Sequence, residues 1–121
     1  MKKISLKRIY DEPSDKDGYR VLVDRLWPRG ISKEDANLDE WNKEIAPSTA
    51  LRKWFDHKEA LFDEFTSLYC NELLAKKVDL NRLRAIAKNN NITLLYGAKN
   101  IKINHAIILK DVLLEKISNK Q

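Results

Sequence analysis

The chain has 121 residues and a mass of 14.2 kDa; 43% of its residues are hydrophobic, 34% charged and 8% aromatic. This is the balance of one soluble globular domain, and the length excludes two domains of ordinary size. Cys70 is the single cysteine, which excludes an internal disulfide, and no apolar run is long enough to cross a membrane. We therefore expect a reduced, cytoplasmic protein without membrane association.

The formal net charge of +5 and an isoelectric point near 9.3 raise the question of nucleic-acid binding. The charge is unevenly spread, with +3 over residues 1–30, −5 over residues 31–75 and +7 over residues 76–121. No basic run and no basic stripe interleaved with aromatic residues occurs. A nucleic-acid-binding module that uses the lysine-rich ends is therefore an alternative, and a less favoured one.

Two strands are predicted in the first 30 residues. Residues 4–9 alternate imperfectly between apolar and polar, and residues 19–26 are rich in β-branched and apolar side chains. Turn-forming residues at 11–18 separate them, with Ser14 able to cap one helical turn. The second strand should stop at the Trp-Pro-Arg-Gly sequence of residues 27–30, because proline cannot continue a β-ladder.

Helical segments are predicted over the middle of the chain. We expect short helical pieces over residues 31–46 and a better helix from Ser48 to about His57. Asp56 is predicted to cap a long helix whose apolar stripe reaches Leu73. The residues predicted to share the inner face of the first of these helices are Leu51, Trp54 and Phe55.

The last third is predicted to contain two helices and one strand. Asp79 is expected to cap a helix that stops at the asparagines of residues 89–91. Residues 92–96 are almost wholly apolar, as in a strand covered on both faces, and Asn104 is expected to cap the last helix. The tail, 118–121, should fray. The pattern predicts a single α/β domain with a small, mostly parallel central sheet of three or four strands flanked by helices.

The two loops that follow the clearest strands predict a ligand site. Ligands of parallel sheets gather beyond the carboxyl ends of the strands, where loops lead into helix N-termini. If the strands are parallel, residues 25–30 and 97–105 share one edge and bring arginines beside an anion-attracting helix start. We therefore predict a site for a small anionic or polar ligand. The residues predicted to bind it are Arg25, Trp27, Arg29, Arg52 and Asn104.

Several of these residues also have ordinary structural interpretations. Asp24 can form a satisfied ion pair with an element above the sheet, and Arg29 can be held in the same way. Trp27 can serve in the core instead of lining a pocket. A third class of function, a protein-interaction module, follows if Trp27, Trp41 and Trp54 mark an interface.

His57 and His105 are the two histidines, and both are candidates for acid–base catalysis because imidazole titrates near neutral pH. His105 is predicted at a helix N-terminus, where the dipole favours a neutral ring, whereas His57 at a helix end has a structural alternative. No metal-ligand spacing and no glycine-rich nucleotide loop occurs, so no metal or cofactor is predicted. Whether a reaction is catalysed, and how many subunits assemble, is left open.

Three motifs stand out along the chain: Val23-Asp24-Arg25-Leu26-Trp27-Pro28-Arg29-Gly30; Ala46-Pro47-Ser48 with Leu51-Arg52-Lys53-Trp54-Phe55 and His57; and Thr93-Leu94-Leu95-Tyr96 with Ala98 and Asn104-His105-Ala106. Together they resemble the YeaO-like branch of the domain-of-unknown-function 488 family, over nearly the whole chain. The resemblance implies one YeaO-like α/β domain over residues 1–121, and it implies no established activity.

Other branches of that family carry an Asp-Val-Arg sequence after the second strand and a Cys-His-Arg sequence after the last one. The corresponding positions here look like Asp24-Arg25 and Asn104-His105-Ala106, so the cysteine is absent. Thiol chemistry should therefore not be transferred to this chain. A site built on Arg25, Arg29, Asn104 and His105 is unaffected by that difference.

Overall fold

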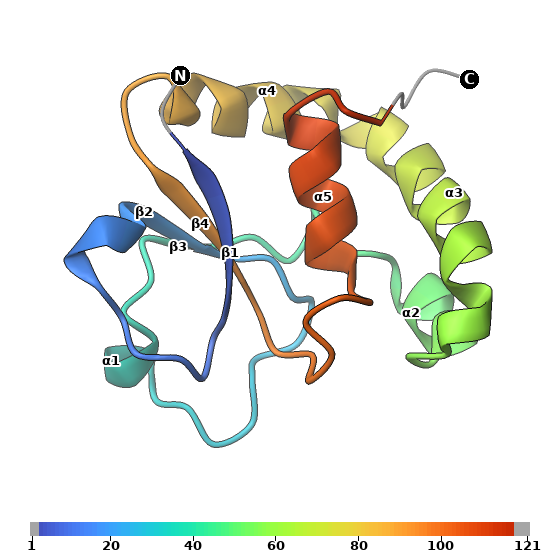
Figure 1. Ribbon diagram of the computed structural model, residues 1–121, viewed down its shortest axis with the longest axis horizontal. Coiled ribbons are helices and arrows are strands. Elements are labelled where there is room, and N and C mark those ends of the chain that lie inside the picture. The colour runs from blue at the N-terminus through green and yellow to red at the C-terminus, as the bar shows by residue number, and fades with distance from the viewer. Residues whose placement is uncertain (1–2, 118–121) are drawn as a thin grey trace.

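The strands form one parallel sheet in the order β1-β4-β2-β3. In the computed structural model, which describes residues 3–117, β4 lies between β1 and β2 and is buried along its whole length (Figure 1). A parallel sheet of four strands with flanking helices confirms the predicted α/β fold. The strands are Ile4–Arg8 (β1), Tyr19–Leu22 (β2), Glu40–Trp41 (β3) and Ile92–Tyr96 (β4).

The helices cover the two faces of the sheet unequally. The helices are Lys33–Ala36 (α1), Thr49–Phe55 (α2), Phe62–Leu73 (α3), Lys77–Ala87 (α4) and His105–Leu113 (α5), with 3₁₀ turns at Asp15–Asp17 (η1), Glu59–Leu61 (η2) and Leu74–Lys76 (η3). Figure 1 shows α3, α4 and α5 on one side of the sheet, whereas the short α1 lies on the other. Helix α5 packs on β1 and β4, and α3 packs on α5.

Alternation along the strands divides the core into two clusters, because successive side chains of a strand point to opposite faces. Val21 and Leu94 belong to the larger cluster, which the long helices cover. Their neighbours Leu22 and Leu95 belong to a smaller cluster that Trp27 and Trp41 help to close, along with Ala36 of α1. The apolar run of β4 is thus covered on both faces, as the sequence predicts.

The predictions for residues 19–26 and 31–46 differ from the structure. The strand expected over residues 19–26 ends at Leu22, although the Val23 N–H still donates to the Leu95 carbonyl oxygen at 3.0 Å. In the region 31–46, predicted as helical pieces, α1 is the single helix, and the unpredicted strand β3 pairs with β2. A two-residue strand is too short to produce a period-two pattern, so the sequence carries no signal for it.

Two of the predicted capping positions, Ser14 and Asn104, are confirmed, and Ser48 is a cap that was not predicted. The side chains of Ser14, Ser48 and Asn104 accept N–H groups of the first turns of η1, α2 and α5. Each sits at the junction of extended chain and helix, where the first N–H groups lack intrahelical partners.

Two other predicted caps are wrong. Asp56 ends α2 in the left-handed conformation, with φ of 48°, and does not cap α3. Asp79 lies inside the first turn of α4, which begins at Lys77, and its carboxylate accepts from Asn42 Nδ2 at 2.6 Å and from Arg82. Asp56 therefore ends the preceding helix instead of beginning the next one, while the contact of Asp79 with Asn42 is a tertiary one that local sequence cannot reveal.

The prediction that Trp54 faces inward is also wrong: its side chain is 40% exposed, whereas Leu51 and Phe55 are buried. Residues four apart lie nearly on one line along a helix, while adjacent residues differ by about 100° around the axis, so Trp54 lies off the Leu51–Phe55 line. The last helix ends at Leu113, and the tail predicted at 118–121 lies outside the described residues.

Candidate ligand-binding site

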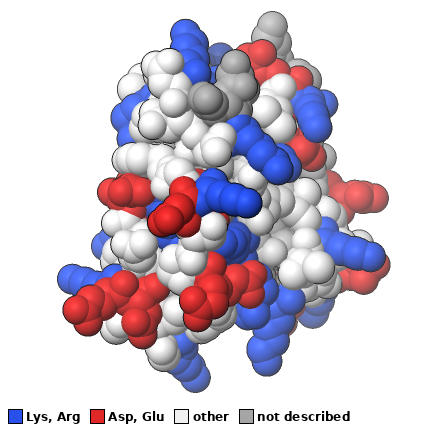
Figure 2. Space-filling model, turned by 60° about the vertical axis from the view of Figure 1, so that its left-hand side comes forward, with Lys and Arg blue, Asp and Glu red and all other residues white. Residues whose placement is uncertain are grey.

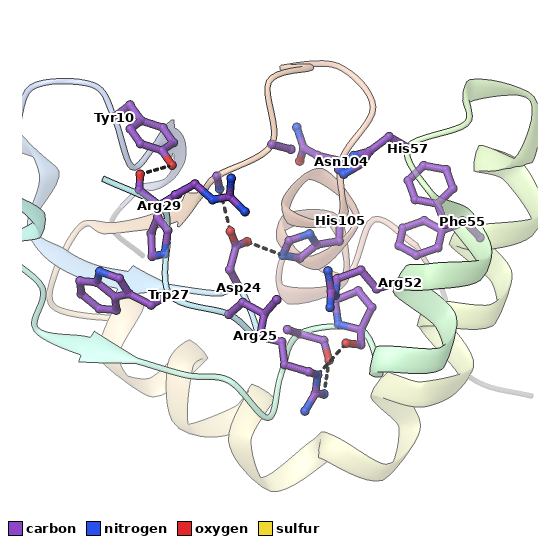
Figure 3. A pocket seen from close by; sticks show the side chains of 17 residues that line it. Tyr10, Asp24, Arg25, Trp27, Arg29, Arg52, Phe55, His57, Asn104 and His105 are labelled. Atoms are coloured by element: carbon purple, nitrogen blue, oxygen red, sulfur yellow. Dashed lines mark hydrogen bonds and ion pairs between the residues drawn. The ribbon is translucent and has the colours of Figure 1, made fainter. Parts of the chain in front are cut away.

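A hollow of about 420 Å³ lies beyond the carboxyl ends of β2 and β4. Because these strands are parallel neighbours, the segments that leave them, 24–29 and 97–105, meet at one edge of the sheet. Helix α2 and the residues around its ends form a further wall. The residues predicted from the sequence that line this hollow are Arg25, Trp27, Arg29, Arg52, His57, Asn104 and His105 (Figure 3).

At the centre of the hollow, Asp24 and His105 form a pair that the sequence did not reveal (Figure 3). The Asp24 Oδ2 atom accepts the Gly97 N–H at 2.8 Å, and His105 Nε2 lies 3.3 Å from Asp24 Oδ1. An aspartate at the end of one strand and a histidine at the helix start after its parallel neighbour are the signal that could have linked them. Sequence reasoning treated the two separately.

The hydrogen bonds of His105 assign the positions of its ring protons. Nε2 lies 2.8 Å from the Val23 carbonyl oxygen, and a carbonyl can only accept, so Nε2 carries a proton. Among residues 3–117, Asp24 Oδ1 is the one buried side-chain polar atom without a hydrogen-bond partner. The second ring nitrogen, Nδ1, has no hydrogen-bond partner among these residues and is not buried, and His105 is one of the residues that line the hollow.

Gly97 permits the close approach that holds the Asp24 carboxylate. A Cβ atom at position 97 would lie 3.0 Å from Asp24 Oδ2, tighter than ordinary contact. Two hydrogen bonds from Arg8, to the carbonyl oxygens of Gly97 at 3.4 Å and of Ala98 at 2.9 Å, fix the loop that contains this glycine. These hydrogen bonds hold the loop after β4 in place beside the Asp24 carboxylate.

Arg29 and Arg52 are exposed, and neither side chain forms a hydrogen bond or ion pair with any residue between 3 and 117. Figure 3 shows them on opposite sides of the Asp24–His105 pair, both extending toward it. The backbone at Arg29 is nevertheless held, because its carbonyl oxygen accepts the Tyr10 hydroxyl at 2.9 Å. Two guanidinium groups are thus presented to the hollow from fixed backbone.

Arg25 and Asn104 use their polar groups to brace the walls. The Arg25 guanidinium donates to the carbonyl oxygens of Pro47 at 3.0 Å and Ala46 at 3.1 Å. Asn104 accepts the Ile107 N–H and donates to the Asn100 carbonyl at 2.9 Å, so both ends of its amide are engaged. Arg25 and Asn104 therefore help to shape the walls of the hollow, and the positive charge of Arg25 lies close to it.

Trp27 combines the two interpretations that the sequence left open. Its ring packs edge-on against Trp41 with centroids 5.2 Å apart, and its N–H donates to the Ile31 carbonyl at 2.7 Å. The same half-buried side chain lines the hollow. Trp41 donates to the Asp24 carbonyl at 2.8 Å, so the tryptophan pair also supports the segment that carries Asp24.

His57 lies exposed where α2 ends. Asp56 and His57 both have positive φ values, 48° and 57°, and two successive non-glycine residues in this region are uncommon. The tight reversal turns the chain back toward α3 and leaves the imidazole at the rim of the hollow. The site therefore has one histidine held in its centre and one at its margin.

Sequence reasoning missed an apolar part of the lining. Phe55 and Phe65 stack with ring centroids 4.1 Å apart, and both line the hollow together with Pro47. Leu26 and Tyr10 lie in the same lining and are exposed. These residues come from several separate elements, so no local pattern announces them.

Two buried groups of α3, the Tyr69 hydroxyl and the Cys70 thiol, have raised pKa values. Burial, and next the charge of Glu72, raises the pKa of Tyr69 well above its ordinary value, and its hydroxyl donates to the Ile45 carbonyl at 2.7 Å. Burial likewise raises the pKa of the Cys70 thiol. Both therefore stay protonated near neutral pH, and Tyr69 supports His105 through an edge-on ring contact at 6.1 Å.

Between residues 3 and 117, no group of three or more His, Cys, Asp or Glu side chains is arranged to hold a metal ion. Over the same range, no helix has both the length and the apolar character needed to cross a membrane. Acidic and basic side chains are interspersed on the face shown in Figure 2.

A family model described as the inactive DUF488-N3 subclade matches residues 3–121. The chain belongs to this subclade. It is 52% identical to the uncharacterised protein YeaO of Escherichia coli over 110 residues, which cover 91% of this chain and 96% of YeaO. It is 37% identical to uncharacterised proteins of Mycobacterium bovis and Mycobacterium tuberculosis over 111 residues, 92% of this chain and 93% of theirs. No solved structure matches it. The DUF488 resemblance expected from the three motifs is thereby confirmed.

Proposed function

We propose that this DUF488-N3 protein binds a small organic anion in the hollow at the carboxyl edge of its sheet. The observation that carries the proposal is the pair of arginine side chains, Arg29 and Arg52, that point into one hollow without a carboxylate partner among residues 3–117. A guanidinium group matches carboxylate and phosphate oxygens in two-pronged geometry. Both groups lie near the start of α5, whose dipole adds further attraction for negative charge.

Binding without chemical conversion is favoured by two considerations. The matched family model is described as inactive. In addition, the position that resembles the cysteine of other DUF488 branches is Asn104, whose amide caps α5 and offers no nucleophile. In this proposal, His105 Nδ1 accepts a hydrogen bond from a donor group of the ligand. Acid–base catalysis through His105, with His57 at the rim, is the alternative.

Thermal unfolding in low salt with a panel of carboxylated and phosphorylated metabolites tests the proposal. A ligand at 100 times its Kd adds about 2.7 kcal/mol to the free energy of unfolding, which raises the melting temperature of a domain of this size by roughly 10 °C. The Arg29→Ala and Arg52→Ala variants should lose that shift. Lys53→Ala is the matched control, because Lys53 is an exposed cation of α2 outside the hollow. A panel without hits, or a shift that both arginine variants retain, would refute anion binding here.

The other two classes of function have less support. On the face shown in Figure 2, acidic and basic side chains are mixed, so this face offers no wholly basic patch to nucleic acid, whose binding would weaken steeply with added salt. Trp27 and Trp41 donate their N–H groups to internal carbonyls, whereas Trp54 is 40% exposed. One isolated aromatic ring is weak support for a protein interface.

A further inference from the structure

The lining of the hollow contains both charged and apolar side chains. Arg29 and Arg52 flank the Asp24–His105 pair, as Figure 3 shows. The apolar and aromatic members of the lining include Leu26 and Trp27 on the segment after β2 and Phe55 on α2. A ligand that touched only the arginines would leave these apolar surfaces in water.

Two of the large side chains in the lining have much of their surface exposed to solvent. Leu26 is 59% exposed and Tyr10 43% exposed, and both line the hollow. A single exposed leucine is ordinary on a protein surface. Here, however, the two exposed large side chains share the lining of one hollow with the rings of Trp27, Phe55 and Phe65, and concave apolar surface with a few polar groups is typical of small-molecule sites.

The polar groups available set the charge of the ligand. The lining holds three arginines and one carboxylate, Asp24, and the Arg25 guanidinium already donates to two backbone carbonyls. Among the aromatic members of the lining, the Tyr10 hydroxyl and the Trp27 N–H already donate to backbone carbonyls, so they offer no free donor to a polyanion that is polar throughout. A volume of about 420 Å³ lies at the lower end of the range for small-molecule pockets, about 300 to 1,000 Å³. One anionic head on a body of one or two rings fits these limits.

We infer that the ligand is an amphipathic organic anion, with a carboxylate or phosphate head at Arg29 and Arg52 and an apolar, preferably aromatic, body against the apolar wall that Leu26 and Trp27 form on the segment after β2. This inference rests on the proposed function, because it names the chemical class that the same hollow selects. Burial of the exposed apolar wall favours ligands with an apolar body, and the guanidinium groups orient the anionic head of the ligand.

Calorimetric titration of the purified protein with four probes tests this class. The probes are 3-phenylpropionate, phenyl phosphate, acetate and inorganic phosphate, so each aryl anion has a partner with the same head and no body. The aryl anions should bind at least about tenfold more tightly than their partners, since each ring buries apolar surface worth more than one factor of ten. Equal affinity within both pairs would overturn the inference while leaving anion binding intact; no binding by any probe would overturn both. Whichever aryl anion binds more tightly identifies the head group.

A pair of surface variants makes the test independent of the choice of probes. Leu26→Ser should weaken the aryl anions several-fold and leave acetate and inorganic phosphate unchanged, because only the body contacts this wall. Val78→Ser is the control, since Val78 is 87% exposed on α4 and lies outside the hollow. Arg29→Ala should instead weaken all four probes. If Leu26→Ser weakened the four probes equally, or none of them, the apolar wall would not be selecting the ligand.

Discussion

His105 combines three contacts on one imidazole ring: the Val23 carbonyl, the Asp24 carboxylate and the edge of the Tyr69 ring. The first two both lie on the Nε2 side. This leaves Nδ1 as the ring nitrogen without a hydrogen-bond partner between residues 3 and 117, and in the tautomer with the proton on Nε2 it is an acceptor. The position of one proton, on His105 Nε2, therefore decides which ring nitrogen is free to accept a hydrogen bond.

The neutral His105 ring should therefore be the tautomer with its proton on Nε2. Nitrogen-15 NMR of the imidazole groups distinguishes the two tautomers by the chemical shifts of the ring nitrogens. His57 is the internal control, because it is exposed and has no hydrogen-bond partner between residues 3 and 117 that would select one form. A His105 spectrum with the proton on Nδ1 would contradict the contact to Val23.

At the scale of elements, α2 forms one wall of the hollow and is fixed at its start by a hydroxyl group. Ser48 Oγ accepts the Leu51 N–H at 3.1 Å and donates to Glu72 Oε2 at 2.6 Å, while the Ser48 N–H donates to Glu72 Oε1. One residue thus caps α2 and joins it to α3. The position of Arg52, one turn into α2, depends on this junction.

Ser48→Ala should lower the free energy of unfolding by about 2 to 3 kcal/mol, because it removes a cap worth about 1 kcal/mol and a hydrogen bond to a carboxylate. Ser32→Ala is the matched control, since Ser32 caps the short exposed α1 through one bond to the Asp35 N–H. That change should cost about 1 kcal/mol or less. Urea denaturation measures both, and equal losses would show that Glu72 adds nothing to the junction.

Elements with a strong local signal were predictable from the sequence, and elements made by tertiary contact were not. The apolar run of β4 and the cap at Asn104 follow from residue types alone. Strand β3 consists of two residues that pair with β2, and Asp79 binds Asn42, a partner that only the folded chain brings close.

The same distinction applies to the candidate site. Its two loops could be placed together because parallel strands end at one edge. The Asp24–His105 contact depends on the order of the strands. The stacked rings of Phe55 and Phe65 in the lining depend on how α2 packs. The spacing of these residues along the sequence predicts neither feature.

At the scale of the whole molecule, two groups of ion pairs hold the sheet: one joins η1 to β1 and β2, and the other joins β3 to α4. Asp17, on η1, is buried and paired with Arg20 of β2 and Lys7 of β1. Burial alone would raise the pKa of Asp17, but hydrogen bonds from Lys7, the Ser14 backbone and Arg20 hold it below its ordinary value of 3.8. Glu40 follows the same pattern: burial raises its pKa, but Arg82 and Tyr19 hold it below 4.5.

The free energy of unfolding should therefore fall on acidification. A carboxyl group with a depressed pKa in the folded state gives its full contribution above its unfolded-state pKa, and that contribution is lost as the pH drops through the folded-state pKa. The loss should begin near pH 4.5 and deepen below 3.8, the ordinary values of the two groups.

Urea denaturation between pH 7 and pH 2.5 measures this dependence. Asp17→Asn should cost about 3 kcal/mol at pH 7, because it leaves the buried Arg20 uncompensated, and should flatten the acid limb. Asp15→Asn, an exposed change in the same turn, should alter stability by no more than about 0.5 kcal/mol. An Asp17→Asn variant with the acid dependence of the parent protein would refute the assignment.

The order of the strands has a consequence for biosynthesis. Strand β4 joins β1 to β2, yet among residues 3–117 it is translated after the other three strands. A nascent polypeptide that ends before residue 92 holds β1 without a neighbour, so the sheet can close only after residues 92–96 have left the ribosome. Until then β1 presents unpaired backbone N–H and C=O groups, which are sites at which chains can aggregate.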